Sequence, residues 1–224
     1  MPQKRKELNI EGSNLWYLVG LITSDGCLSS DGRHINITSK DYEFLRGIKN
    51  LVGLGNKIGT KNKRKINEAY YLQFSNRNLY EFLLIIGLTP NKSLTLTNLD
   101  IPEEYFVDFL RGLIDGDGSV RRWIHHTNLH EQWSLSIYSG SQIFITWLQS
   151  KIEKYLDCRG KIYSALRPQR KNFIYTLKYG KMGAKAILQN CYYQGAFGLD
   201  RKIKLAQDCF ESHTGWTQSK TVVN

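Results

Sequence analysis

Two aspartates that close the same nine-residue phrase are the residues with the clearest chemical potential. The phrase reads LVGLITSDG at residues 18–26 and LRGLIDGDG at residues 110–118. Its aspartates, Asp25 and Asp117, are 92 positions apart (117 − 25 = 92). Two carboxylates brought together beside a phosphate can hold a divalent cation, an arrangement that supports phosphodiester hydrolysis.

Small residues recur within each phrase at a spacing that suits a helix. Gly20 and Ser24 are four positions apart in the first copy, as are Gly112 and Gly116 in the second. Residues four apart lie on one face of a helix, and small residues there let two helix backbones approach closely. We therefore predict that the two phrases form helices that pack against each other.

Both predicted helices end at their aspartates. Gly26 and Gly118 follow directly, and a glycine there suits the left-handed residue that often ends a helix. A carboxylate at this end is disfavoured by the helix dipole, and two neighbouring carboxylates repel each other. Stability therefore does not account for Asp25 and Asp117, whereas a Mg²⁺ ion between them would.

The order of elements that follows each phrase is the same. Alternating runs predict strands and 3.6-residue periodicity predicts helices, in the order α-β-β-α-β-β-α, twice. We expect an α+β fold of two pseudo-symmetric repeats. Residues 13–88 form the first, 89–102 the linker, 103–211 the second with a closing helix near 200–211, and 212–224 a tail.

The predicted strands alternate between apolar and polar residues, so each sheet should bury one face under helices and leave the other polar and open. Such a face could be merely solvated, but a two-stranded ribbon also fits the DNA major groove. The predicted DNA-facing residues are Arg33, His34, Asn36, Thr38, Lys57, Lys61, Gln73 and Ser75 in the first repeat, and Arg121, Gln132, Ser134, Ser136, Lys161, Tyr163, Arg167 and Lys178 in the second.

Charge and composition narrow the class of protein. The chain has 31 Lys and Arg against 20 Asp and Glu, a formal net charge of +11, which favours a polyanionic partner. The run KNKRK at residues 61–65 is expected at a hairpin tip, where it could touch phosphates. No apolar run reaches transmembrane length and no signal-peptide pattern opens the chain, so we expect a soluble intracellular protein without a membrane partner.

The cysteines and histidines give little sign of a zinc site. None of the four cysteines forms a Cys-x-x-Cys pair, and we interpret them as free thiols, mostly in the core. Three histidines occur in WIHHTNLHE at residues 123–131, between two strand-like runs. A hairpin tip explains them better than a metal site, because no further ligands are nearby in sequence.

The two phrases and their shared order of elements resemble the LAGLIDADG homing endonucleases, in the single-chain form with two motifs. The resemblance implies a saddle of antiparallel sheets over double-stranded DNA, with the motif helices packed at a pseudo-two-fold axis. It implies a monomer that makes a Mg²⁺-dependent double-strand break in a long, nearly unique site, leaves short 3′ overhangs and promotes mobility of its host intron. Mn²⁺ or Ca²⁺ would be able to replace Mg²⁺ for binding.

The resemblance also assigns roles around the motif. It implies that Asp25 and Asp117 are the catalytic acids and metal ligands, and that Ser24 and Gly116 lend backbone carbonyls to the metal. The copies differ at their sixth position, Thr23 against Asp115, and we interpret Asp115 as structural because that position is usually peripheral.

Basic residues after each repeat form the next predicted group. The family places one near the cleaved phosphate, which points to Lys92 in GLTPNKS and Lys202 in GLDRKIK. The alignment is loose in the second copy, so Arg201 and Lys204 stay alternatives, and solvated loop lysines are the plain alternative for both. Ser39 and Ser139 end the second strand of each repeat and are candidates for ordering water, with Lys40 as a competitor.

Other functions fit the same resemblance. An RNA maturase that acts on intron RNA, or a DNA-binding regulator, could share the fold. Both acids are present, which favours cleavage over a regulator without excluding a bifunctional maturase. Arg33, His34 and Asn36 have no close counterpart in the second repeat, so an asymmetric target about two helical turns long is expected.

Overall fold

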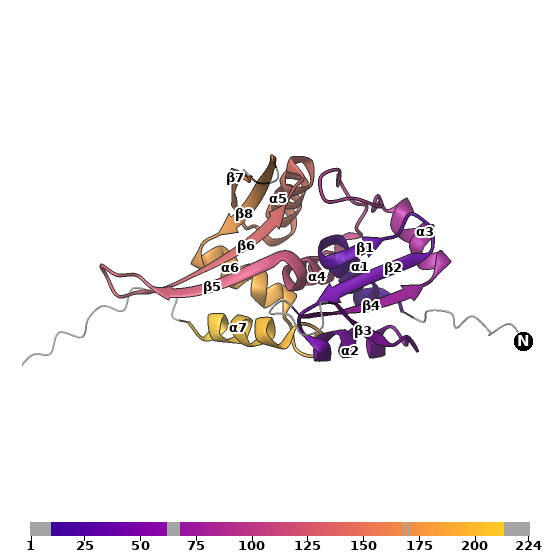
Figure 1. The fold of residues 1–224 in the computed structure, drawn as a ribbon. Helices are drawn as coiled ribbons and strands as arrows, with labels where there is room; N and C mark the ends of the chain where they lie inside the picture. Colours follow the sequence, from indigo (N-terminus) through magenta and orange to yellow (C-terminus); the bar gives the residue numbers. More distant parts are fainter. Residues whose placement is uncertain (1–9, 62–67, 168, 170, 213–224) are drawn as a thin grey trace, which may run out of the picture.

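The computed structural model describes residues 10–61, 68–167, 169 and 171–212 of the chain. Within these residues the protein forms two four-stranded antiparallel sheets and seven α-helices. The repeats lie side by side, with α1 and α4 together between the sheets (Figure 1). This is the α+β saddle of two repeats that the sequence predicts.

The first repeat has the strand order β1-β2-β4-β3. Its first strand is only three residues long, and no apolar run in the sequence marks it. The elements are α1 (Gly12–Asp25), β1 (Gly26–Leu28), β2 (His34–Ser39), α2 (Tyr42–Leu51), β3 (Ile58–Lys61), β4 (Ala69–Ser75) and α3 (Arg77–Ile85).

The second repeat repeats this order as β5-β6-β8-β7 and adds a closing helix. A short 3₁₀ turn leads into its motif helix. The elements are η1 (Glu103–Tyr105), α4 (Phe106–Asp117), β5 (Gly118–Ile124), β6 (Glu131–Ser139), α5 (Gln142–Leu156), β7 (Lys161–Arg167), β8 (Asn172–Tyr179), α6 (Lys181–Cys191) and α7 (Asp200–Glu211).

Equivalent side chains start the second helix of each repeat. Asp41 accepts a hydrogen bond from the backbone N–H of Phe44 at 3.1 Å, and Ser141 accepts one from Phe144 at 3.2 Å. Each N-cap satisfies a backbone donor that the first turn leaves without a helical partner. These helices then cover the apolar faces of their sheets.

Glycines allow α1 and α4 to pack backbone to backbone. A Cβ placed on Gly20 would lie 2.0 Å from the carbonyl oxygen of Phe109, and one on Gly112 would lie 2.1 Å from that of Tyr17. No side chain fits at such distances. The predicted close approach of the two motif helices is confirmed.

The expected conformation of the glycines after the motif helices is wrong. Gly26 has φ −88° and Gly118 has φ −77°, both extended rather than left-handed. Each helix instead turns directly into a strand. A Cβ at Gly26 would lie 2.5 Å from the Cα of Ile22, and one at Gly118 would lie 2.6 Å from the carbonyl oxygen of Ile114. Glycine is needed at these sharp turns for space, not for positive φ.

The segment that joins the repeats is packed against the core. Leu96, Leu99 and Ile101 are buried, and the backbone N–H of Asp100 donates to the carbonyl oxygen of Ile86 at 3.0 Å. The hydroxyl of Ser141 donates to the carbonyl oxygen of Leu96, so the predicted linker contacts both repeats.

Three of the four cysteines are buried, and all four are free thiols, as the sequence predicts. Among the described residues, no helix is long and apolar enough to cross a membrane.

The β5–β6 hairpin is the largest difference between the repeats. β5 has seven residues where β1 has three, and the outer part of β6 pairs with β5 alone. The hairpin therefore projects from the body as a two-stranded ribbon (Figure 1). The three histidines lie at its tip, as expected. Of the KNKRK run, only Lys61 lies within the described residues.

Candidate active site

The two motif aspartates lie next to each other at the ends of α1 and α4. Both side chains are exposed at the surface. A Cβ placed on Gly116 would lie 3.3 Å from the carboxyl carbon of Asp25, so this carboxylate reaches the residue that precedes Asp117. The packing of two helices has brought together residues 92 positions apart.

This neighbourhood makes both carboxylates harder to ionise. The surrounding protein partly removes Asp25 from water, which raises its pKa from the ordinary 3.8 to about 6, and the negative charge of Asp117 adds to this shift. The surrounding protein also raises the pKa of Asp117. The positive charges of Lys92 and Lys202 act in the opposite direction on both groups. Such a site favours additional positive charge.

Lys92 is buried behind the first acid. Its side chain is 7% exposed, and its Nζ donates a hydrogen bond to the carbonyl oxygen of Gly26. The preceding Asn91 has φ 58°, a left-handed conformation that turns the loop inward. Burial lowers the pKa of Lys92, and the nearby Cys27, Asp117 and Asp25 oppose that shift.

Lys202 occupies the corresponding place in the second repeat. It is 2% exposed, and its Nζ donates to the carbonyl oxygens of Ile114 and Asp115, the latter at 2.7 Å. Burial lowers its pKa to about 8. Arg201 and Lys204 are both exposed. Neither Lys92 nor Lys202 is a solvated loop lysine, and of the three second-repeat candidates Lys202 alone is buried against a motif helix.

The donor set at this site fits a magnesium ion. Within the described part of the chain, no group of three or more His, Cys, Asp or Glu side chains could hold a metal by itself. Mg²⁺ is commonly held by one or two carboxylates, with waters and substrate phosphate oxygens completing its shell. Asp25 and Asp117 meet that requirement, and their raised pKa values are consistent with it.

Other predicted site residues have local structural contacts. The hydroxyl of Ser24 donates to the carbonyl oxygens of Gly20 and Leu21 in its own helix. Ser39 accepts from the backbone N–H of Asp41, and Ser139 accepts from that of Ser141, each at 3.1 Å. These two serines thus shape equivalent turns. Their suggested role with water stays a prediction, as do the metal-binding carbonyls of Ser24 and Gly116.

The open face of the first sheet carries a connected polar group. Lys61 Nζ donates to Thr38 Oγ1 at 3.1 Å, and Thr38 Oγ1 donates to Asn36 Oδ1 at 3.1 Å. Gln73 lies directly across from Asn36 and is exposed. The structure therefore brings these predicted residues together on one surface. Ser75 is exposed on the same strand as Gln73, and Lys57 is exposed just before β3.

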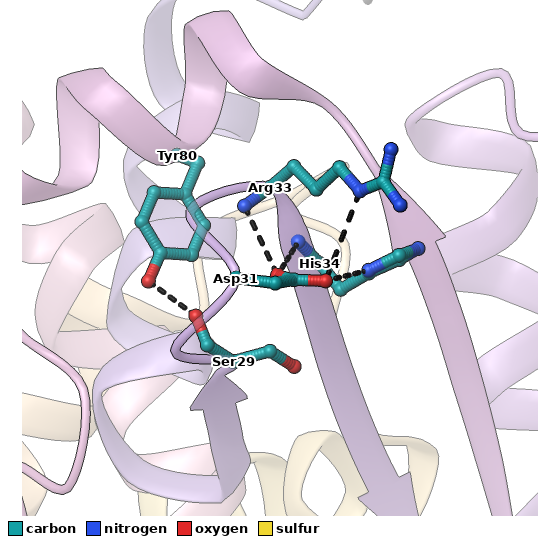
Figure 2. Close-up of polar contacts among 5 residues, drawn as sticks. All are labelled: Ser29, Asp31, Arg33, His34 and Tyr80. Carbon is teal, nitrogen blue, oxygen red and sulfur yellow. Dashed lines mark hydrogen bonds and ion pairs between the residues drawn. The ribbon is translucent and has the colours of Figure 1, made fainter.

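Arg33 and His34 are held by an acid in the turn before β2. Asp31 Oδ1 accepts hydrogen bonds from the backbone N–H groups of both residues, and Asp31 Oδ2 contacts both side chains (Figure 2). Hydrogen bonds from His34 hold the pKa of Asp31 well below its usual range. A DNA contact by either side chain would have to compete with Asp31, which sequence reasoning did not consider.

The second sheet carries several exposed cations, two of which face each other. Lys161 of β7 and Lys178 of β8 lie directly across from each other, and both are exposed. Arg121, Tyr163 and Arg167 are also exposed, and Gln132 is partly buried. Like charges directly opposite each other destabilise a sheet, so folding does not account for this pair.

The expectation of an open polar face is wrong at Ser134 and Ser136. Ser134 is 2% exposed and Ser136 is 6% exposed. Ser134 lies across from Arg121, and Ser136 lies across from Lys178. Short side chains between longer ones lie below the surface of the sheet. In this structure the neighbouring cations, rather than the serines, are placed to meet a ligand.

Sequence reasoning also missed a hydrogen-bond network around Asp115. Its buried carboxylate accepts hydrogen bonds from the hydroxyls of Tyr17 and Tyr192, each at 2.7 Å. The signal was present in the sequence. At the 92-residue offset, Tyr17 corresponds to Phe109 and Asp115 to Thr23. The two repeats therefore differ at two positions whose side chains are hydrogen-bonded to each other.

Part of the chain matches a known protein family. Residues 13–87 match the family model described as a LAGLIDADG-like domain. The first repeat is thus similar to this family. The second repeat has the same order of strands and helices, and its own copy of the phrase ends in Asp117. Comparison with curated proteins gave no match.

Solved structures with this LAGLIDADG fold cover nearly all of the chain. The meganuclease I-SmaMI, bound to uncleavable DNA, has a TM-score of 0.58 and 14% identity over 91% of this chain and 89% of that one. Full-length DUF199/WhiA from Thermatoga maritima has a TM-score of 0.55 and 16% identity over 90% of this chain. The N-terminal LAGLIDADG domain of DUF199/WhiA has a TM-score of 0.55 and 17% identity over 88% of this chain and 90% of that one. The present chain spans 62% of full-length WhiA. At these identities the matches establish the fold.

Proposed function

We propose that this protein is a site-specific homing endonuclease. It makes a metal-dependent double-strand break in a long asymmetric DNA site, leaves short 3′ overhangs and so promotes mobility of its host intron. The observation that carries the proposal is the pair of exposed carboxylates, Asp25 and Asp117, at the adjoining ends of α1 and α4. Nothing in the packing of the helices requires acids there, and the helix dipole disfavours them.

The proposed cleavage chemistry depends on the charges gathered at the site. A divalent cation held by Asp25 and Asp117 would act as a Lewis acid on an oxygen of the scissile phosphate. Asp25 and Asp117 would hold this positive charge at the axis between the repeats, because their own carboxylates would repel a phosphate. Lys92 and Lys202 lie behind them with lowered pKa values and supply positive charge where negative charge develops during cleavage. The first repeat and the linker contribute Asp25 and Lys92, and the second repeat contributes Asp117 and Lys202, so one acid and one lysine are available for each of the two cuts.

The DNA surface is the open face of the two sheets. The paired Lys161 and Lys178 repel each other in the free protein, and phosphate or guanine acceptors would relieve that repulsion. The net charge of +11 supports the same partner. The projecting β5–β6 ribbon exists in one repeat only, which supports a target with unequal halves.

A DNA-binding protein that does not cut is the second candidate. The fold is shared with DUF199/WhiA as well as with a meganuclease, and at these identities likeness of fold does not by itself select cleavage. The two acids favour cleavage over this candidate. The two acids do not exclude a bifunctional maturase that also acts on intron RNA.

The test is selection of a target from a randomised duplex library. The protein is incubated with the library in Mg²⁺, and cut ends are sequenced. Parallel reactions contain EDTA, or the Asp25→Asn, Asp117→Asn double variant with Mg²⁺. We expect one long asymmetric site with short 3′ overhangs, cut only by the wild-type protein with metal. A selected site that is bound but never cut would support the second candidate.

A further inference from the structure

The contact between Tyr17 and Asp115 exists on one side of the pseudo-two-fold axis only. Tyr17 of α1 donates to Asp115 Oδ2 of α4 at 2.7 Å. The equivalent positions hold Phe109 and Thr23, which cannot form this bond. The hydroxyl of Thr23 donates at 2.8 Å to Val19 of its own helix. One repeat thus contains a buried polar connection that the other lacks.

Asp115 also holds the chain that enters α7. Its Oδ1 accepts from the hydroxyl of Tyr192 at 2.7 Å, and its Oδ2 accepts from the backbone N–H of Leu199 at 2.9 Å. Leu199 is the N-cap residue of α7. The carboxylate is 2% exposed, and burying one is costly unless hydrogen bonds compensate. Three donors provide that compensation here.

Lys202 completes the arrangement from the first turn of α7. Its Nζ donates to the backbone carbonyl of Asp115 at 2.7 Å, while the Asp115 side chain holds Leu199 three residues earlier. Asp115 therefore contacts the segment at two points, through its main chain and through its side chain. The ammonium is fixed beside the end of α4, one turn from Asp117.

A second group of contacts anchors the same segment further from Lys202. Arg111 donates to the carbonyl oxygens of Phe197 and Cys191, and it is paired with Asp108 at 2.7 Å. These contacts hold the middle of the segment without reaching α7. Among these contacts, those of Asp115 lie nearest to Lys202 along the chain.

We propose that Asp115 is a positioning residue that fixes Lys202 for cleavage of one DNA strand. This inference rests on the proposed endonuclease function. The first repeat places Lys92 differently, through a loop with left-handed Asn91 and a bond to the carbonyl oxygen of Gly26. Loss of the Asp115 carboxylate should therefore affect one lysine and one strand.

The test compares Asp115→Thr with Asp115→Asn. Threonine is the residue at the equivalent position of the first repeat, and it cannot reach Leu199. Asparagine keeps an oxygen for Leu199 and Tyr17, while the Tyr192 hydroxyl can reverse to accept from the amide. With each DNA strand end-labelled, Asp115→Thr should slow the strand that Lys202→Met slows, by about tenfold or more. The other strand should change less than twofold, and Asp115→Asn should retain most activity.

A double variant separates positioning from general destabilisation. Asp115→Thr, Lys202→Met should be no slower than Lys202→Met alone, because both changes remove the same contribution. Thr23→Val is the matched control and should leave both strands unaffected. Equal slowing of both strands, or additive effects in the double variant, would overturn the proposal.

Chemical labelling tests the same point without cleavage. The free protein is treated with an acylating reagent, and modification of each lysine is followed by mass spectrometry. Asp115→Thr should raise the labelling rate of Lys202 about tenfold and leave that of Lys92 unchanged. Unchanged labelling of Lys202, or a parallel rise at both lysines, would refute positioning even if the protein proves to be a nuclease. If the wild-type protein cuts no DNA, this assay still decides whether Asp115 holds Lys202 in place.

Discussion

Gly20 of α1 and Gly112 of α4 each face the backbone of the other helix. A Cβ on either residue would come within 2.1 Å of a carbonyl oxygen, that of Phe109 or that of Tyr17. This contact brings the ends of the two helices together, and with them Asp25 and Asp117. The position of the proposed catalytic pair therefore depends on two residues that have no side chain.

Gly112→Ala is expected to destabilise the protein strongly. The methyl group would meet backbone atoms rather than a side chain that can move, so the cost should reach or exceed the roughly 1–3 kcal/mol of an overpacked core. Thermal unfolding should show a Tm several degrees lower. Gly55→Ala is the control, because a Cβ there meets nothing within 4 Å. Equal Tm values for the two variants would contradict the close packing.

Asp25→Asn should stabilise the metal-free protein at neutral pH. The pKa of Asp25 is about 6 in the folded state and is ordinarily 3.8. At pH values between these two, the folded state therefore binds more protons than the unfolded state. Stability from this group is therefore lost as pH rises through about 4 to 6. In EDTA at pH 7.5 the variant should gain about 1 kcal/mol, a modest figure because the carboxylate is exposed and screened by solvent. The gain should vanish near pH 4.

The pH comparison needs an acid from outside the site as its control. Glu104→Gln removes an exposed carboxylate on η1 and is the control for loss of one negative charge elsewhere on the surface. A gain for Asp25→Asn that is the same at pH 4 and pH 7.5 would argue against the raised pKa.

Lys92→Met and Lys202→Met should each produce a strand-biased nickase. Each lysine is buried behind one motif helix, so removing its charge should slow one strand by about a hundredfold or more and the other strand much less. A nicking assay with the strands labelled separately measures this. Arg201→Met is the control from the same helix, since that side chain is exposed. Equal slowing of both strands would assign the lysines to binding or folding.

Lys161→Gln and Lys178→Gln should separate stability from DNA binding. Removing one of two facing cations should leave stability equal or a few tenths of a kcal/mol higher. Binding should weaken, and the slope of log affinity against log salt should fall by about 1 for each phosphate that the variant no longer neutralises. Lys185→Gln, on α6, is the control for net charge. An unchanged salt slope in both sheet variants would remove this pair from the DNA surface.

Helices and strands depend largely on residues that are close in sequence, so local sequence patterns predicted them well. The bounds of α7 match the predicted closing helix near 200–211, and Asp41 and Ser141 begin their helices as caps do. The repeated phrase also predicted that Asp25 and Asp117 would meet, since internal symmetry carries long-range information.

What the sequence did not predict depends on neighbours that are distant along the chain. Ser134 and Ser136 alternate correctly, yet longer cross-strand residues cover them. Gly26 was expected to be left-handed, but a turn directly into β1 made space the constraint. The contacts of Asp115 come from α1 and from the connection between α6 and α7, so only the broken symmetry with Thr23 pointed to them.

The most direct test of the account is cleavage of the selected site by Asp117→Asn, measured beside its affinity for that site. Asparagine keeps the size of the side chain and removes the charge that would hold the cation. We predict that the variant binds the site in Ca²⁺ with nearly wild-type affinity and makes no double-strand break in Mg²⁺. Double-strand cleavage at the wild-type rate by Asp117→Asn would contradict the central claim that the paired motif acids perform the chemistry.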